Sequence, residues 1–146
     1  SHVAGIAGST ADNGVGGLGS GYRCRILPLK QATEDFPNSR SVIDGYEGIL
    51  YAAQMGAHIV NCSWGGAGGF SQAAQDIINT ATALGTLVVA AAGNASSLMD
   101  DAYYPASFDN VMSVGASEEN DTPAGFSNFG VKTSVFAPGD NILSTV

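Results

Sequence analysis

The sequence predicts an α/β protein with a three-layer α/β/α architecture and a mostly parallel sheet. Two observations support this prediction. Between residues 41 and 92, segments whose apolar residues recur at helical spacing alternate with short apolar segments typical of strands. The segment 87–92 is apolar at every position, which is typical of a parallel strand that helices cover on both faces.

Two helices are expected, and each is followed by a strand. The first runs from Ser41 to Met55, where Ser41 and Asp44 resemble a capping box and Gly56 ends the helix. The second begins after Ser71, whose hydroxyl can cap it, and ends at Gly85. The expected strands are residues 22–29, 57–62, 86–92, 111–116 and 134–137.

Composition narrows the classes of partner. The 146 residues carry a formal net charge of −8 without any cluster of Lys and Arg, so nucleic acid and anionic membranes are poor partners. No stretch of about 20 apolar residues is present that could span a bilayer. Cys24 and Cys62 are too few for a disulfide framework and are typical of small buried residues on strands.

In a parallel α/β sheet, function is expected beyond the carboxyl ends of the strands. Two such ends are Ser63-Trp-Gly-Gly66 and Gly93-Asn94. The first offers backbone donors and acceptors to an extended peptide that adds itself as a strand, although an ordinary glycine turn has the same composition. The Asn94 carboxamide can donate to a developing oxyanion or can simply cap the strand end. The residues alone leave these alternatives open.

Two glycine-rich features resemble ligand sites. Residues 14–19 match the pattern G-x-G-x-x-G, but they precede a predicted strand instead of following one, which argues against a nucleotide site. Asp12-Asn-Gly14 offers oxygen ligands of the kind that Ca²⁺ prefers, and it also has the composition of a turn.

Taken together, several segments resemble the subtilisin family of serine proteases, the subtilases. The resemblance runs along the whole chain, and the segments that carry it are Ser1-His-Val-Ala-Gly-Ile-Ala-Gly8, Asn13-Gly-Val-Gly16, Ile59-Val-Asn-Cys-Ser-Trp-Gly-Gly66, Val88-Val-Ala-Ala-Ala-Gly-Asn94, Tyr104-Pro-Ala106, Val111-Met-Ser-Val-Gly-Ala116, Phe126-Ser-Asn-Phe-Gly130 and Phe136-Ala-Pro-Gly139.

The resemblance implies a site as well as a fold. It implies a secreted endopeptidase that hydrolyses polypeptides through an acyl-enzyme, with Asn94 as the side-chain donor of the oxyanion hole. It implies no certain cofactor or metal, although the intact enzyme could bind Ca²⁺. The implied substrate-binding residues are the edge strand Ser63, Trp64 and Gly65, the pocket walls Gly66, Ala92 and Gly93, and a lining side chain, Tyr103.

The departures from the family pattern set a further expectation. The catalytic histidine and aspartate of the family motifs would precede Ser1, and the nucleophilic serine would follow Val146. Residues 1–146 are therefore expected to be part of one catalytic domain, to lack the triad and to be inactive alone. Without the neighbouring strand they are expected to shift their strands together, to form a homodimer or to be only marginally stable. His2 is expected to point into the core, and an upstream strand would lie between the strands near residues 26–29 and 59–62. The alternative is a non-catalytic peptide-binding module of the same fold.

Overall fold

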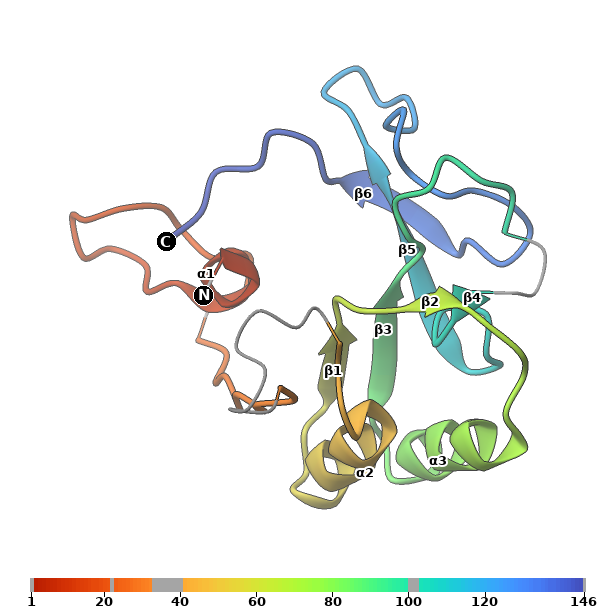
Figure 1. Cartoon of the computed structure of the whole chain (residues 1–146). Helices are drawn as coiled ribbons and strands as arrows, with labels where there is room; N and C mark the ends of the chain where they lie inside the picture. Colours follow the sequence, from red (N-terminus) through yellow and green to blue (C-terminus); the bar gives the residue numbers. More distant parts are fainter. Residues whose placement is uncertain (1, 22, 33–40, 100–102, 146) are drawn as a thin grey trace. The chain divides into compact units, whose positions relative to one another are not determined.

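The computed structural model describes residues 2–21, 23–32, 41–99 and 103–145, which divide into two units (Figure 1). The smaller unit comprises residues 1–28 and 141–146, and the larger unit comprises residues 29–140. All of the strands among the described residues lie in the larger unit, and so do residues 63–66 and 92–94.

The smaller unit is built around α1 (His2–Gly8), which carries no buried residue. The loop after the helix folds back on it, where Ser20 N–H donates to the carbonyl of Ile6 at 2.8 Å. The predicted strand at 22–29 is wrong: Tyr22 lies outside the described residues, and residues 23–29 form no strand. A strand needs a neighbour to complete its ladder, and Arg23 instead adopts a left-handed turn conformation with a φ of 68°.

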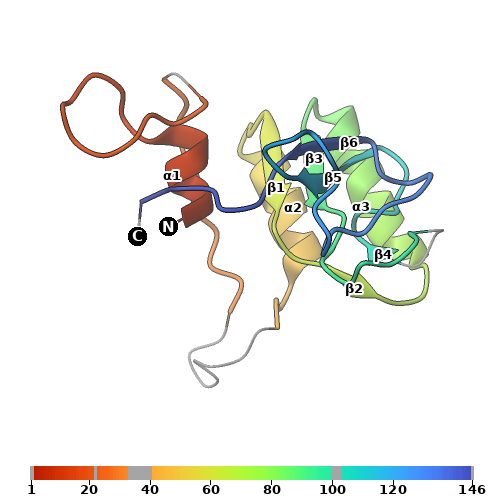
Figure 2. The same cartoon turned by 90° about the horizontal axis from the view of Figure 1, so that it is seen from above.

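The larger unit contains a four-stranded sheet in the order β1-β3-β5-β6. Its strands follow one another across the sheet in Figure 2, and every neighbouring pair is parallel, which confirms the predicted mostly parallel sheet. The bounds are β1 (Ile59–Cys62), β3 (Leu87–Ala91), β5 (Val111–Ser117) and β6 (Val135–Pro138). A second, antiparallel sheet joins β2 (Gly66–Ala67) to β4 (Tyr103–Tyr104).

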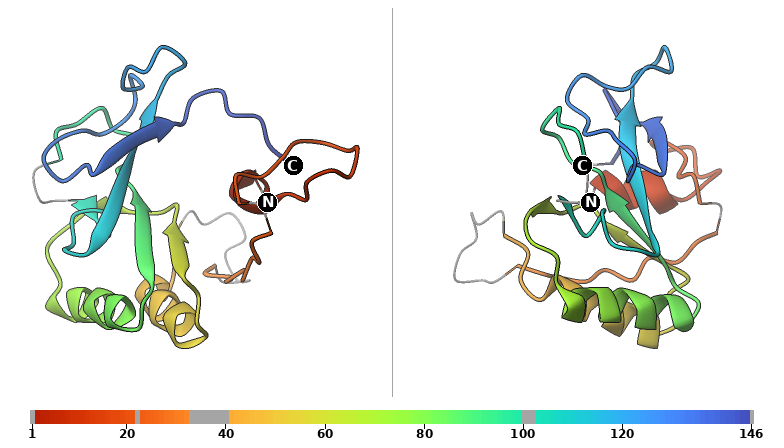
Figure 3. Two further views of the ribbon diagram at one scale, coloured as in Figure 1. Left: turned by 180° about the vertical axis from the view of Figure 1, so that it is seen from behind. Right: turned by 90° about the vertical axis from the view of Figure 1, so that its right-hand side faces the viewer.

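Two helices, α2 (Gly45–Gln54) and α3 (Gln72–Ala83), lie side by side (Figures 1 and 3) and pack against each other. Ile49 of α2 and Ile78 of α3 belong to the same buried cluster as Val88 and Ala90 of β3. Because Val88 and Ala90 share one face of the strand, the helices cover that face of the sheet. The burial of this apolar face is the main source of stability of the unit.

Local signals set the bounds of α3 correctly but not the start of α2. The Ser71 hydroxyl caps α3 by accepting from Ala74 N–H at 3.3 Å, and Gly85 ends the helix region with a φ of 89°. The predicted capping box of α2 is wrong, because Asp44 adopts a left-handed conformation and makes no side-chain cap hydrogen bond. Residues 41–44 therefore precede the helix.

The opposite face of the sheet is apolar and partly exposed. Ile59 pairs with Leu87 in register, so both point to this face, and they are 62% and 44% exposed. Met112 of β5 and Val135 of β6 add further exposed apolar surface. The expectation that β3 is buried on both faces therefore holds only for the face that α2 and α3 cover, within residues 29–140. We call this surface the open face.

Candidate active site

The two chain segments that the sequence singles out lie at the same edge of the sheet. Cys62 at the end of β1 is in register with Ala90 of β3, so residues 63–66 and 92–94 leave neighbouring parallel strands at their carboxyl ends. The first segment crosses from β1 to β2 (Figure 1). Its Ser63 is exposed, and the Ser63 hydroxyl accepts a hydrogen bond from the Asn61 amide at 2.8 Å.

The Trp64 side chain is an anchor that packs toward α2. Its indole ring meets the Tyr46 ring edge-on at a centroid distance of 5.4 Å. A Cβ atom at Gly45 would lie 2.7 Å from Cζ2 of Trp64, so the first turn of α2 needs a glycine at this position. The Trp64 backbone, by contrast, has no hydrogen-bond partner among the described residues.

An aromatic network extends from Trp64 toward β4. Phe108 contacts Tyr46 at a ring-centroid distance of 5.9 Å and Tyr104 at 4.4 Å. Phe108 is buried. This packing fixes the position of β4, and with it Tyr103, relative to residues 63–66.

The turn after β3 presents Asn94. Ala92 is buried, Gly93 has a φ of 107° that favours glycine, and Asn94 is exposed. Among the described residues the Asn94 carboxamide makes no hydrogen bond. Its N–H groups are therefore available to an acceptor outside the chain.

Asn128, for which the sequence predicts no role, holds this turn in place. Asn128 is 2% exposed. Its side-chain amide donates to the Ala92 carbonyl at 2.9 Å, and its oxygen accepts from Ala95 N–H at 2.9 Å and from Ser97 N–H at 3.2 Å. The Asn128 backbone N–H also donates to the Gly93 carbonyl at 2.9 Å. One side chain thus fixes both ends of the turn. The signal for this role in the sequence is a polar residue between the apolar residues of Phe126-Ser-Asn-Phe-Gly130.

Tyr103 lies between the two segments. A Cβ atom at Gly93 would be 2.6 Å from Cζ of the Tyr103 ring, and one at Gly65 would be 3.0 Å from Cε1. The Tyr103 hydroxyl donates to the Gly65 carbonyl at 3.4 Å. The structure therefore brings Gly65, Gly93 and Tyr103 together, while Gly66 pairs with Tyr104 in the small sheet.

His58 is not placed to activate a serine beside Asn94. His58 precedes β1, at the end of the sheet opposite to the turn that carries Asn94. The expectation that His2 points into the core is wrong: His2 is exposed, and its ring nitrogen lies 3.2 Å from the Ile142 carbonyl. The Cys62 thiol cannot serve as the nucleophile in place of a serine, because burial raises the pKa of Cys62 to about 12 and keeps the thiol protonated.

The remaining candidate features lie elsewhere. In the part of the chain that the structure describes, no three His, Cys, Asp or Glu side chains gather as metal ligands. The Asn13 side-chain oxygen accepts from Val15 N–H at 3.0 Å, as in a turn. No helix among the described residues is long and apolar enough to cross a membrane.

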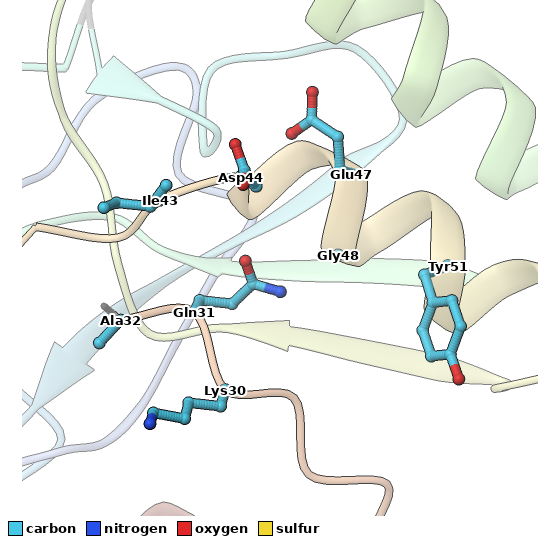
Figure 4. Close-up of a pocket in the computed structure, with 8 residues that line it drawn as sticks. All are labelled: Lys30, Gln31, Ala32, Ile43, Asp44, Glu47, Gly48 and Tyr51. Atoms are coloured by element: carbon cyan, nitrogen blue, oxygen red, sulfur yellow. The ribbon is translucent and has the colours of Figure 1, made fainter. Parts of the chain in front are cut away.

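A separate cavity of about 360 Å³ lies against α2 (Figure 4). Its charged lining residues are Lys30, Asp44 and Glu47. The Gln31 side chain reaches over Gly48, where a Cβ atom would clash with it. None of the residues that the sequence predicted for the site lines this cavity.

The sequence and the structure both have known counterparts. The Subtilase family, Peptidase_S8, matches residues 1–146. The chain is 38% identical over 158 residues to the extracellular basic protease of Dichelobacter nodosus, a match that covers 100% of this chain and 25% of that protein. It is 39% identical over 145 residues to a thermophilic serine proteinase of a Bacillus species, covering 99% of this chain and 35% of that protein.

A solved protease structure from Pseudoalteromonas arctica matches with a TM-score of 0.87 at 31% identity, covering 95% of this chain and 43% of that one. The chain thus spans 25% and 35% of the length of the two curated relatives above.

Proposed function

Because this chain belongs to the subtilase family of serine proteases, we propose that it forms the substrate-binding and oxyanion-stabilising part of an endopeptidase domain. The family match is continuous over residues 1–146, which supports a single domain of which this chain is a part. In the whole protein the substrates are polypeptides, hydrolysed through an acyl-enzyme. The name of the extracellular relative supports a secreted protein.

Asn94 is the proposed oxyanion donor, and its free carboxamide is the observation that carries the proposal. Asn94 is exposed at the carboxyl end of a central strand, and its side chain has no partner among the described residues. Its turn is held by the buried Asn128. Because the backbone of the turn is held before the reaction, it need not reorganise as charge develops on the substrate oxygen.

Residues 63–65 are the proposed strand that pairs with the substrate backbone. The free backbone N–H and carbonyl of Trp64 can bond an extended peptide, while the Trp64 indole anchors the strand on α2. Gly65, Gly66, Ala92 and Gly93 are the proposed walls of the adjoining side-chain pocket, and Tyr103 lines it. The small residues let a peptide backbone approach closely.

Peptide binding to the 146-residue chain tests this proposal. An extended tetrapeptide ending in a free carboxylate places a charged oxygen where the oxyanion would form. We expect its addition to shift the backbone amide NMR signals of Trp64 and Gly65 and the side-chain amide signals of Asn94. Signals from Asn120, which lies in an exposed turn, serve as the reference. An absence of any shift, or shifts confined to the cavity at α2, would contradict the proposed function.

The non-catalytic alternative shares this peptide site. Peptide binding therefore supports both functions. Only the reading frame around this chain, with or without the family's histidine and serine motifs, separates them.

A further inference from the structure

The Tyr103 ring occupies space between the two proposed pocket walls. Its Cε1 and Cζ atoms would lie 2.8 and 2.6 Å from a Cβ atom at Gly93, and Cε1 would lie 3.0 Å from one at Gly65. All three distances are shorter than ordinary van der Waals contacts between carbon atoms. The ring therefore packs directly on the backbone of both walls, and only glycine is accommodated on either side.

The backbone of Tyr103 is fixed on both of its sides. Its carbonyl accepts from Ser107 N–H at 2.8 Å, and its N–H donates to the Ser107 hydroxyl at 3.3 Å. Tyr103 also pairs with Ala67 in the small antiparallel sheet. The next residue, Tyr104, packs on the buried Phe108.

These constraints limit how far the ring can withdraw. The hydroxyl contacts the Gly65 carbonyl, and the ring packs partly against the buried cluster that contains Ala92 and Phe108. A bulky substrate side chain entering between Gly65 and Gly93 would have to displace this ring. A hydrogen or a methyl group would not.

We infer that Tyr103 makes this site selective for peptides whose residue before the scissile bond has a small side chain, namely Gly, Ala or Ser. The inference rests on the proposed function, because it takes residues 63–66 and 92–94 as the walls of that pocket. Tyr103 is then the residue that limits side-chain size. Discrimination of about tenfold or more between Ala and Phe is expected, since even one methylene group of misfit in a pocket has an effect of about that size.

The test uses the 146-residue chain and a peptide series that differs only in its C-terminal residue. Succinyl-Ala-Ala-Pro-Xaa peptides with a free carboxylate, where Xaa is Gly, Ala, Val, Leu or Phe, are titrated by calorimetry. We expect affinity to fall steeply beyond Ala. Tyr103→Ala should raise the affinity for the Phe peptide to that of the Ala peptide or above it, whereas Tyr103→Phe, which keeps the ring, should retain the preference for small residues.

Tyr51→Ala is the matched control, because Tyr51 is an exposed tyrosine of α2 that lines the separate cavity. It should leave the preference unchanged. Equal or tighter binding of the Phe peptide by the unmodified chain would overturn the inference while leaving the proposed function standing. If no peptide bound to the unmodified chain or to Tyr103→Ala, the proposed function would fail and the inference with it. The series on the unmodified chain decides the question even if Tyr103→Ala does not fold.

Discussion

The side-chain amide of Asn128 donates to the carbonyl of Ala92 at 2.9 Å, and both residues are buried. This hydrogen bond joins the segment after β5 to the end of β3. The Asn128 oxygen accepts from two further N–H groups of the same turn. The turn that presents Asn94 is therefore shaped by a residue 34 positions later in the sequence.

Asn128→Ala should destabilise the chain substantially. The substitution leaves the Ala92 carbonyl and the N–H groups of Ala95 and Ser97 without their partner. One buried polar group left unpaired costs roughly 1–3 kcal/mol, so we expect the free energy of unfolding to fall by about 3 kcal/mol. Urea denaturation measures the loss, and hydrogen exchange at Ala95 and Ser97 locates it.

Asn120→Ala is the control for this experiment. The Asn120 side chain accepts from Thr122 N–H in an exposed turn, so its loss should change stability by only about 0.5 kcal/mol. If Asn128→Ala were as mild as Asn120→Ala, the turn would be held by other contacts.

Asn94→Ala should leave the stability of this chain unchanged, because the exposed carboxamide makes no hydrogen bond with the described residues. In a complete subtilase domain that contains this region, the same change should lower turnover by about 10²–10³ with little effect on substrate binding. That magnitude is taken from subtilisin, a member of the same family. A loss confined to KM would instead indicate a binding role.

The Cys62 thiol should make stability depend on pH above neutrality. Burial raises the pKa of Cys62 from 9.0 to about 12. Above pH 9 the unfolded chain releases the thiol proton while the folded chain keeps it, so the free energy of unfolding falls as the pH rises from about 9 to about 12. The expected slope is on the order of 1 kcal/mol per pH unit.

Urea denaturation of the parent chain and Cys62→Ala between these pH values isolates this contribution from other titrating groups. The difference in the free energy of unfolding between the parent chain and Cys62→Ala should shrink as the pH rises. In the folded chain, iodoacetamide should modify the exposed Cys24 and spare Cys62. Equal labelling of both cysteines under native conditions would show that Cys62 is accessible.

The open face leads us to expect self-association. Ile59 and Leu87 are 62% and 44% exposed at neighbouring positions of the sheet, and contiguous exposed apolar surface favours a protein partner. Light scattering should show a dimer that Ile59→Lys with Leu87→Lys converts to monomer. Val131→Lys, at an 87% exposed position outside the strands, should leave the dimer intact. A parent chain that stays monomeric at every concentration would refute a dimer.

Sequence reasoning succeeded where neighbouring residues decide the conformation. Ser71 begins α3 by accepting a hydrogen bond from the N–H three residues later, and Gly85 ends the helix region in a left-handed conformation. Both signals can be recognised in the sequence. The prediction of where α2 starts failed, because Asp44 adopts a left-handed conformation. The preceding residue, Ile43, donates its N–H to the Gln31 carbonyl. Such a distant contact leaves no periodic signal.

The candidate site shows the same limit. The positions of Asn94 and Gly65 at the ends of parallel strands follow from the order of the predicted elements. The contact of Tyr103 with Gly65 joins residues 38 positions apart, and only the folded chain reveals that the ring lies between the walls. The direction of Trp64 toward α2 likewise depends on Gly45, whose small size has no meaning until the helix is placed.

The isolated chain should not cleave peptides. Acyl transfer by a serine needs a histidine within hydrogen-bonding distance of the hydroxyl. Neither histidine ring accepts a hydrogen bond from a serine among the described residues. The Ser63 hydroxyl accepts a hydrogen bond from the Asn61 amide, which is no base.

An oxyanion donor without an activated nucleophile retains little catalytic effect, because groups that act as a unit lose most of their contribution when one is absent. A fluorogenic peptide should therefore show no turnover above a buffer control, and a fluorophosphonate probe should label no serine. Subtilisin treated in parallel supplies the positive control, and Ser63→Ala supplies the matched variant. Stoichiometric labelling of the parent chain that disappears in Ser63→Ala would identify Ser63 as a nucleophile, and the assignment of this chain to substrate binding alone would then be wrong.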